Sequence, residues 1–197
     1  MRKLPIIAII CFGLVTPAHA AEPTPVNFCA KKTTGVVRAI ATGKCRTSEY
    51  SLGNKAIAMP SKRPKGLLPQ LLIRYMAAKA AAKQAGYYLR ITSGYRRLVD
   101  QAYLYKQAVK KYGSEAEAAK WVLPPAYSTH TWGIALDVNF RTKLKKGALW
   151  LDKNGYKWGL CRVYDNEWWH FESNVAPGSK CPKRWKDAMD RFPDALK

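Results

Sequence analysis

Aliphatic side chains occupy every second position in the segment GIALDVNF, residues 133–140. Successive side chains of a β-strand point to opposite faces, so Ile134, Leu136 and Val138 share one face and Asp137 lies on the other. A strand of this kind buries its aliphatic face in a core and leaves its carboxylate on the opposite side. The segment therefore predicts a sheet strand that carries an acidic group away from the core.

Helical patterns surround this strand in the sequence. Apolar residues recur at helical spacing between 67 and 85, and alanines fill most other positions, which predicts a long helix. A second helix is expected at 98–111, before Gly113, and Ser114 has a glutamate three residues on, the spacing of a capping box that starts a third helix. Helices and strands without regular βαβ alternation indicate an α+β fold, with a small antiparallel sheet flanked by helices. Further expected elements are a strand at 87–92, a short helix within 150–159, a strand or strand pair at 162–171 and an amphipathic helix at 183–192.

The first twenty residues have the three parts of a secretory signal. A basic start at Met1–Lys3 precedes a short apolar run, and small residues surround the expected cleavage site after Ala20. We therefore expect a signal peptide at 1–20, an N-terminal disulfide-stapled β element with a linker at 21–60, and the main domain at 61–197. An uncleaved membrane anchor is the alternative for the first segment. The periplasm is the expected location, with secretion as the alternative.

Cysteine usage agrees with export. Cys11 falls within the expected signal peptide, and four cysteines remain: Cys29, Cys45, Cys161 and Cys181. An even number of cysteines in an exported chain indicates two disulfides. Three pairings are possible, and we expect Cys29 with Cys45 and Cys161 with Cys181 because each bridge would close a short segment. A structural zinc held by all four is the alternative, which the lack of any C-x-x-C spacing disfavours.

The chain is strongly basic, with 34 lysines and arginines against 13 acidic residues and a formal net charge of +21. Such a charge attracts polyanions and raises their rate of encounter. For an exported protein these would be cell-wall polymers, lipid headgroups or lipopolysaccharide, and nucleic acid only in an extracellular setting. The basic residues are scattered along the chain, so a solvated cationic surface accounts for most of them.

Beyond the expected signal peptide the chain contains only two histidines, and both stand near carboxylates. Two imidazoles and a carboxylate are a common ligand set for a catalytic zinc with an open water position. His130 precedes Asp137 by seven residues, an odd separation, so it reaches the same side only from a turn at Trp132 and Gly133. Taken singly, each of these residues also has an ordinary structural explanation.

Glu167 precedes His170 by three residues in the segment EWWHF, residues 167–171. This spacing gives a shared face on a helix but not on a regular strand. A turn or bulge must therefore bring the two side chains together if they cooperate. The aromatic residues of this segment are expected to wall the site, and they are Trp168, Trp169 and Phe171.

Three ordered motifs resemble one family. The segment SGYR at 93–96 with Gln101 five residues on, STHTWGIALD at 128–137 and EWWH at 167–170 are similar to the zinc D-Ala-D-Ala carboxypeptidases of the VanY type. The last motif also looks like the related VanX dipeptidases. The resemblance covers about residues 67–175 and implies the metallopeptidase fold shared with hedgehog-type domains, with a zinc site on the sheet.

The resemblance implies a role for each matched position. His130, Asp137 and His170 would bind Zn²⁺, and Glu167 would act as general base and then as general acid. Arg96 would bind a substrate carbonyl or carboxylate and stabilise the oxyanion. Further positions that would contact substrate or order the site are Ser93, Tyr95, Gln101, Ser128 and Trp169.

The expected function is zinc-dependent hydrolysis of peptidoglycan stem peptides, with removal of the terminal D-Ala by a D-alanyl-D-alanine carboxypeptidase as the leading hypothesis. The motifs do not distinguish this activity from an LD-carboxypeptidase or a peptidoglycan endopeptidase of the same family. A different hypothesis is a non-catalytic, cationic cell-wall-binding protein, and a nucleic-acid binder ranks third because charge alone is non-specific. The expected partners are stem peptides and anionic wall polymers, with no specific nucleic acid, and the expected state is a monomer.

Overall fold

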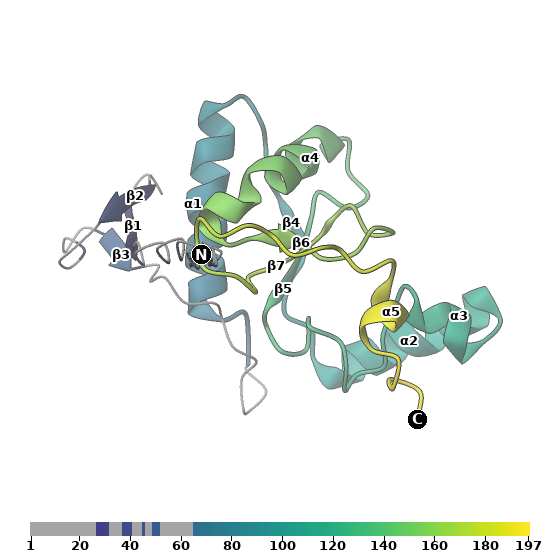
Figure 1. Cartoon of the computed structure of the whole chain (residues 1–197). Coiled ribbons are helices and arrows are strands. Elements are labelled where there is room, and N and C mark those ends of the chain that lie inside the picture. Colours follow the sequence, from purple (N-terminus) through teal and green to yellow (C-terminus); the bar gives the residue numbers. More distant parts are fainter. Residues whose placement is uncertain (1–26, 32–36, 41–44, 46–48, 52–64) are drawn as a thin grey trace, which may run out of the picture.

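The computed structural model describes residues 27–31, 37–40, 45, 49–51 and 65–197 (Figure 1). The expected signal peptide and the expected linker lie outside these residues, so the division into domains stays a prediction. In the N-terminal region three short strands pair antiparallel in the order β2-β1-β3. Cys45 is disulfide-bonded, but the side chain of Cys29 lies outside the described part, so that pairing also stays a prediction. The strands are β1 (Asn27–Lys31), β2 (Val37–Ile40) and β3 (Glu49–Ser51).

The main domain contains a four-stranded sheet in the order β4-β5-β7-β6, and every neighbouring pair is antiparallel. This confirms the predicted α+β class with a small antiparallel sheet. The strands are β4 (Ile91–Ser93), β5 (Ala135–Val138), β6 (Cys161–Arg162) and β7 (His170–Glu172).

Helices cover this sheet from two directions. In Figure 1, α1 and α4 lie together on one side of the sheet, whereas α2, α3 and α5 gather at its other end. Gly113 ends α2 in the left-handed conformation, with φ of 83°, and the Ser114 side chain accepts a hydrogen bond from the Glu117 backbone, as the capping box predicted. The helices are α1 (Pro69–Gln84), α2 (Leu98–Tyr112), α3 (Glu115–Ala119), α4 (Lys145–Asn154) and α5 (Ala188–Arg191), with a 3₁₀ turn at Gly155–Trp158 after α4.

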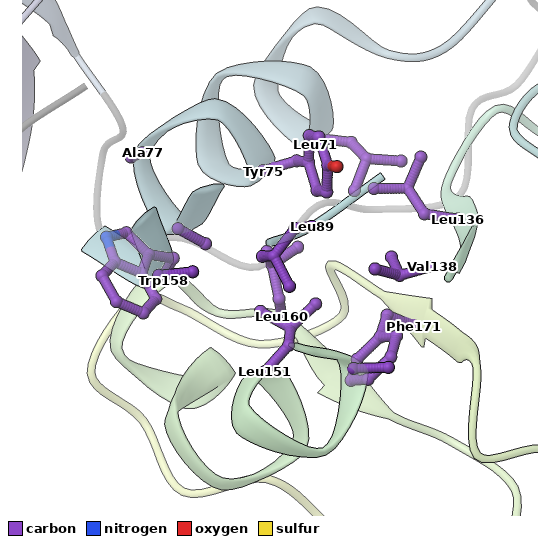
Figure 2. Close-up of a cluster of buried hydrophobic side chains, with 13 residues drawn as sticks. Leu71, Tyr75, Ala77, Leu89, Leu136, Val138, Leu151, Trp158, Leu160 and Phe171 are labelled. Atoms are coloured by element: carbon purple, nitrogen blue, oxygen red, sulfur yellow. The ribbon is translucent and has the colours of Figure 1, made fainter. Parts of the chain in front are cut away.

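The core lies between α1, α4 and one face of the sheet (Figure 2). Leu136 and Val138 of β5 are fully buried there, together with Leu71 of α1 and Phe171 of β7. The strand parity read from the sequence is therefore confirmed, and Asp137 lies on the face of β5 that points away from this core. None of the described helices combines the length and the apolar character needed to cross a membrane.

The C-terminal tail corrects one prediction. Instead of a helix over 183–192, the chain extends through Trp185, whose backbone bridges the region of Tyr164 in parallel, and the helix α5 begins only after Asp187 caps it. A disulfide between Cys161 and Cys181, as expected, ties the tail to β6. The amphipathic pattern was real, but backbone pairing with the strand region outweighed helix formation.

Two other boundaries differ from the prediction. The helix expected within 150–159 begins earlier, at Lys145, and ends at Asn154 before its 3₁₀ extension. The strand expected at 87–92 is shorter and later, because only Ile91–Ser93 pairs with β5. Local periodicity indicated that the elements exist, whereas pairing with neighbours set their ends.

Candidate metal centre

Three side chains converge on the face of the sheet opposite the core. Asp137 of β5 and His170 of β7 are direct partners in the antiparallel register, so their side chains lie on the same face and close together. His130 joins them from the turn before β5. One ligand atom from each of the three residues lies within 4.8 Å of the others, and all three residues are buried.

The turn that carries His130 has the form that the odd spacing required. Gly133 adopts a positive φ of 67°, which costs a glycine little, and its backbone N–H donates to the His130 carbonyl at 3.2 Å. The same carbonyl accepts a 3.1 Å hydrogen bond from the Arg96 backbone. The backbone on both sides of the site therefore fixes the position of His130.

In each imidazole one ring nitrogen faces away from the centre and contacts a neighbouring oxygen. The other nitrogen therefore faces the centre. His130 Nδ1 lies 2.7 Å from the Gly94 carbonyl oxygen, which only accepts hydrogen bonds, so this nitrogen carries the hydrogen and Nε2 faces the centre. His170 Nε2 lies 3.1 Å from a carboxylate oxygen of Glu172, which leaves Nδ1 facing the centre. The two inward nitrogens approach Asp137 Oδ1 at 3.3 and 3.4 Å.

Asp137 is the negative group of the cluster. Burial opposes its ionisation, but His130 and His170 outweigh that effect and hold the pKa of Asp137 well below its usual range. Its Oδ1 is buried and has no hydrogen-bond partner of good geometry among the described residues. Two nitrogens and a buried carboxylate oxygen that face one point match the donor set of a divalent zinc site, so these residues fit such an ion.

Glu167 lies beside the three side chains without belonging to the closest group. It precedes His170 in a turn, in which the His170 backbone N–H donates to the Glu167 carbonyl, and its Oε2 lies 3.7 Å from His170 Nδ1. The expected turn is therefore present. Burial raises the pKa of Glu167 to about 7, with Asp137 adding to the effect and His170 opposing it. A carboxyl group with such a pKa exchanges protons readily near neutral pH.

Arg96 approaches the same point from the turn after β4. Its Nη1 donates to Gln101 Oε1 at 2.6 Å and its Nη2 donates to Ser93 Oγ at 2.8 Å. Burial lowers the pKa of Arg96, and the charges of Asp137 and Glu167 counter that shift. A guanidinium held by two side chains is a fixed cation, suited to a developing negative charge.

A model of the VanY D-alanyl-D-alanine carboxypeptidase family matches residues 67–173, which contain all five of these side chains. The chain belongs to the VanY family. It is 31% identical over 112 residues to a D-alanyl-D-alanine carboxypeptidase of Enterococcus faecalis (strain ATCC 700802 / V583), over 46% of this chain and 42% of that protein. A second relative of the same description, from Enterococcus faecium, is 28% identical over 120 residues, 54% of this chain and 37% of the relative. The chain thus spans less than half the length of these relatives.

Solved VanY structures share the fold of this chain. The structure described as VanYB in complex with D-alanine-D-alanine matches with a TM-score of 0.52 and 25% identity, over 61% of this chain and 81% of that one. A mutant of the VanY D,D-pentapeptidase from the VanB-type resistance cassette, in complex with Zn(II), matches with a TM-score of 0.50 and 25% identity, over 56% and 76%.

The sequence analysis did not predict one part of the centre, and one residue of this part, Arg191, lies outside the VanY match. Glu172 is fully buried, and besides His170 it binds Arg191 Nη1 of α5 at 2.8 Å, which in turn donates to the Tyr164 hydroxyl at 3.2 Å. Burial opposes ionisation of Glu172, but His170 and Arg191 outweigh it and lower its pKa to about 2. Glu172 follows His170 by two residues on one strand, so strand parity would have placed both on one face. No local pattern pointed to Arg191.

The remaining positions named by the VanY resemblance divide between the site and other places. A cavity of about 530 Å³ opens over the metal centre, and Ser93, Gln101, Ser128 and Trp169 line it, whereas Tyr95 is not among its lining residues. Ser93 and Gln101 also bind Arg96, so their contacts order the site. Whether these positions touch substrate stays a prediction.

The expected aromatic wall is only partly present. Trp169 lines the cavity and packs on Phe140, with ring centroids 4.1 Å apart. Phe171 is fully buried in the core and Trp168 packs against that core, so the prediction that these two would wall the site was wrong. On β7 Phe171 neighbours His170 directly, and adjacent strand residues face opposite sides.

Proposed function

We propose that this protein is a zinc-dependent metallopeptidase that removes the terminal D-Ala from peptidoglycan stem peptides. The observation that carries the proposal is the convergence of the three candidate ligands with Glu167 and Arg96 on one cavity. The names of the enterococcal relatives, D-alanyl-D-alanine carboxypeptidase, support the substrate class. The Zn(II) of the related VanY structure supports the choice of metal.

His130 Nε2, Asp137 Oδ1 and His170 Nδ1 would hold the zinc. Bound there, Zn²⁺ supplies a Lewis acid that polarises the scissile carbonyl and lowers the pKa of a coordinated water to near ~7. Glu167 accepts the proton of the attacking water on its carboxylate and returns it to the leaving amine nitrogen, a role suited to its raised pKa. Arg96 stabilises the negative charge that develops on the carbonyl oxygen.

Product analysis tests the activity. Muropeptides incubated with the protein should lose one D-Ala, detected by mass spectrometry, and a chelator should stop the loss. Glu167→Ala should reduce the rate about thousandfold, since general acid–base groups contribute on that order. Glu115→Ala, which removes an exposed carboxylate of α3 outside the cavity, is the matched control. Full D-Ala release by Glu167→Ala would contradict the mechanism.

The same experiment separates the alternatives within the family. An LD-carboxypeptidase would release the D-residue that follows an L-configured centre, and an endopeptidase would cut cross-linked dimers into monomers. Both activities use the same centre, so the products, not the metal content, distinguish them. Release of terminal D-Ala from pentapeptide stems, with tetrapeptide stems left intact, is the result expected here.

A non-catalytic, cationic cell-wall-binding protein is the second candidate, because the chain carries a net charge of +21. This candidate predicts salt-sensitive binding to purified wall polymers that survives His170→Ala and chelation. A metal content of about one zinc per purified chain favours the enzyme instead. Anionic wall polymers as additional partners of the enzyme, without specific nucleic acid, form part of the proposal.

The setting that we propose is outside the cytoplasm. The secretory pattern at 1–20 supports export, and the Cys161–Cys181 disulfide agrees with an oxidising compartment. We place the protein in the periplasm, with secretion as the alternative, and as a monomer. Cell fractionation with N-terminal sequencing of the mature chain tests the compartment and the cleavage site, and light scattering tests the monomer.

A further inference from the structure

The cavity extends well beyond the metal centre along helix α2. Gln101, Leu104, Ala108 and Lys111 all line it, and their spacing of three or four residues places them in one stripe on the helix. Gln101 binds Arg96 at the inner end of this stripe. Ten residues of helix separate Gln101 from Lys111, which corresponds to about 15 Å at ~1.5 Å per residue.

Aromatic rings form the wall of the cavity around Lys111. The rings of Tyr112 and Trp121 stack with centroids 6.2 Å apart and an interplanar angle of 9°, and both residues line the cavity. The Lys111 ammonium lies 4.7 Å from the centroid of the Tyr112 ring and donates to its hydroxyl at 3.1 Å. The left-handed Gly113 reverses the chain after α2, so α3 brings Trp121 back against Tyr112.

The outer cavity carries only positive charge among the described lining residues. The two lining carboxylates, Asp137 and Glu167, both belong to the metal centre, and the remaining charged lining residues are Arg96, Lys111 and Arg141. Within the part of the chain that the structure describes, no carboxylate forms an ion pair with Lys111 or Arg141. An exposed cation over an aromatic stack, with no acidic partner of its own, suits an incoming carboxylate.

We propose that the Lys111 end of the cavity is a subsite for a carboxylate of the substrate peptide, carried by a residue N-terminal to the bond that is cut. This inference rests on the proposed function. A carboxypeptidase substrate ends one residue beyond the scissile bond. The part of the cavity that runs about 15 Å along α2 can therefore hold only the residues that precede this bond. At ~3.5 Å per extended residue, the ~15 Å between Gln101, which binds Arg96 beside the metal centre, and Lys111 corresponds to about four residues, so the carboxylate comes from the third or fourth residue before the scissile bond.

A carboxylate subsite at Lys111 affects which substrates the protein prefers. The protein binds a longer part of the peptide than the terminal D-Ala-D-Ala. It prefers stems whose D-Glu carboxylate is free over stems in which this group is amidated. A solvent-exposed ion pair contributes at most about fivefold to affinity. The preference should therefore be a few-fold, with about fivefold as its upper limit, at low ionic strength, and it should fade at high salt because salt screens exposed charges.

Two synthetic pentapeptides test it. Both have the sequence L-Ala-γ-D-Glu-L-Lys-D-Ala-D-Ala with the lysine acetylated, and they differ only in whether the glutamate carboxylate is free or amidated. Calorimetry on the zinc-loaded, full-length Glu167→Ala variant gives the ratio of the two dissociation constants without turnover. The wild-type protein gives the ratio of kcat/KM by D-Ala release. Both ratios should favour the free acid by a few-fold, up to about fivefold.

Lys111→Ala, made in the same background, should bring both ratios close to one. Lys110→Ala is the matched control, because this neighbouring lysine on α2 is exposed and does not line the cavity, and its ratios should match those of the parent. A preference that survives Lys111→Ala overturns the proposal, as does a preference lost only in Arg141→Ala. Equal binding of both peptides, or no binding of either, overturns it too.

The two readouts keep this inference separate from the function on which it rests. Binding that favours the free acid through Lys111, with no D-Ala released from either peptide, would contradict the proposed carboxypeptidase activity and leave the subsite standing. Hydrolysis of both peptides at equal kcat/KM would support the carboxypeptidase activity and contradict the subsite.

Discussion

His130 and His170 face the same point, but the protein holds them in different ways. The outward nitrogen of His130 binds a backbone carbonyl, that of Gly94. The outward nitrogen of His170 binds the carboxylate of Glu172, which is itself bound to Arg191 from the C-terminal tail. The path of the backbone therefore orients the His130 imidazole, whereas two charged side chains, Glu172 and Arg191, orient that of His170.

The two histidines therefore differ in how sensitive their positions are to mutation. No side-chain substitution removes a backbone carbonyl, so the orientation of His130 depends on the path of the chain through two turns. The orientation of His170 depends on side chains that substitution can delete, and one of them lies after the segment that the VanY family model matches. Groups that orient a metal ligand commonly contribute 10- to 100-fold to metal affinity.

Removal of either imidazole should have the largest effect. His130→Ala and His170→Ala should each weaken zinc binding by more than ~100-fold, the upper range for loss of an orienting group, because each deletes a ligand itself. Zinc titration against a competing chelator measures the affinity. Retention of tight zinc binding by either variant would remove that histidine from the ligand set.

Glu172→Gln should have the next largest effect. The substitution keeps the size of the side chain but leaves Arg191 without its buried counter-charge, which should cost about 3 kcal/mol in the free energy of unfolding. It should also weaken zinc binding by about 10- to 100-fold, because His170 loses its carboxylate partner. Denaturant unfolding and the chelator titration measure the two quantities. Unchanged zinc affinity would show that the carboxylate does not orient His170.

Zinc affinity should also depend on pH through His170. Burial alone would lower the pKa of His170, but Asp137 and Glu172 outweigh it and raise that pKa to about 10. Below this pH the metal must displace a proton, so affinity should rise about tenfold per unit between about pH 6 and pH 9. Glu172→Gln removes one cause of the high pKa, so the rise should level off at a lower pH. A flat profile in the wild type would contradict this assignment.

Arg191→Met should have a smaller effect than Glu172→Gln. Glu172 keeps His170 as a partner, but the variant loses the guanidinium, whose Cζ lies 4.8 Å from the centroid of the Phe192 ring and 5.9 Å from that of the Tyr164 ring. The loss of the hydrogen bonds to Glu172 and to the Tyr164 hydroxyl should cost about 2 kcal/mol of stability and reduce zinc affinity several-fold. Lys186→Met, at an exposed position in the same tail, is the control and should change neither quantity.

Gly94→Ala should have the smallest effect and sharpens the contrast. The carbonyl that binds His130 remains, and the three atoms nearest to the added Cβ all belong to the flexible Leu67 side chain, the nearest at 3.3 Å. Zinc affinity should stay within about twofold of wild type, since substitutions that disturb no specific feature change free energies by about 0.5 kcal/mol. A loss of zinc affinity as large as that expected for Glu172→Gln would show that the position of His130 is as sensitive to mutation as that of His170.

Much of the metal centre could be predicted from the sequence because its residues lie in short local motifs. Strand parity placed Asp137 opposite the core, the odd spacing required a turn for His130, and the three-residue spacing required a turn before His170. The structure contains each of these features. Phe171 faces the core because it alternates with His170 on β7. Trp168 lies in the turn before β7, where strand alternation does not apply, so only packing decided that it contacts the core.

The periodicity of neighbouring residues was enough to predict the α+β class, the main helices and the face of β5 that carries Asp137. The support that Arg191 gives to His170 through Glu172 became visible only in the packed structure. That contact joins residues 19 positions apart, and it depends on a tail led back to the sheet by the Cys161–Cys181 disulfide and the Trp185 bridge. Contacts of this kind arise from packing between elements, which no local pattern in the chain encodes.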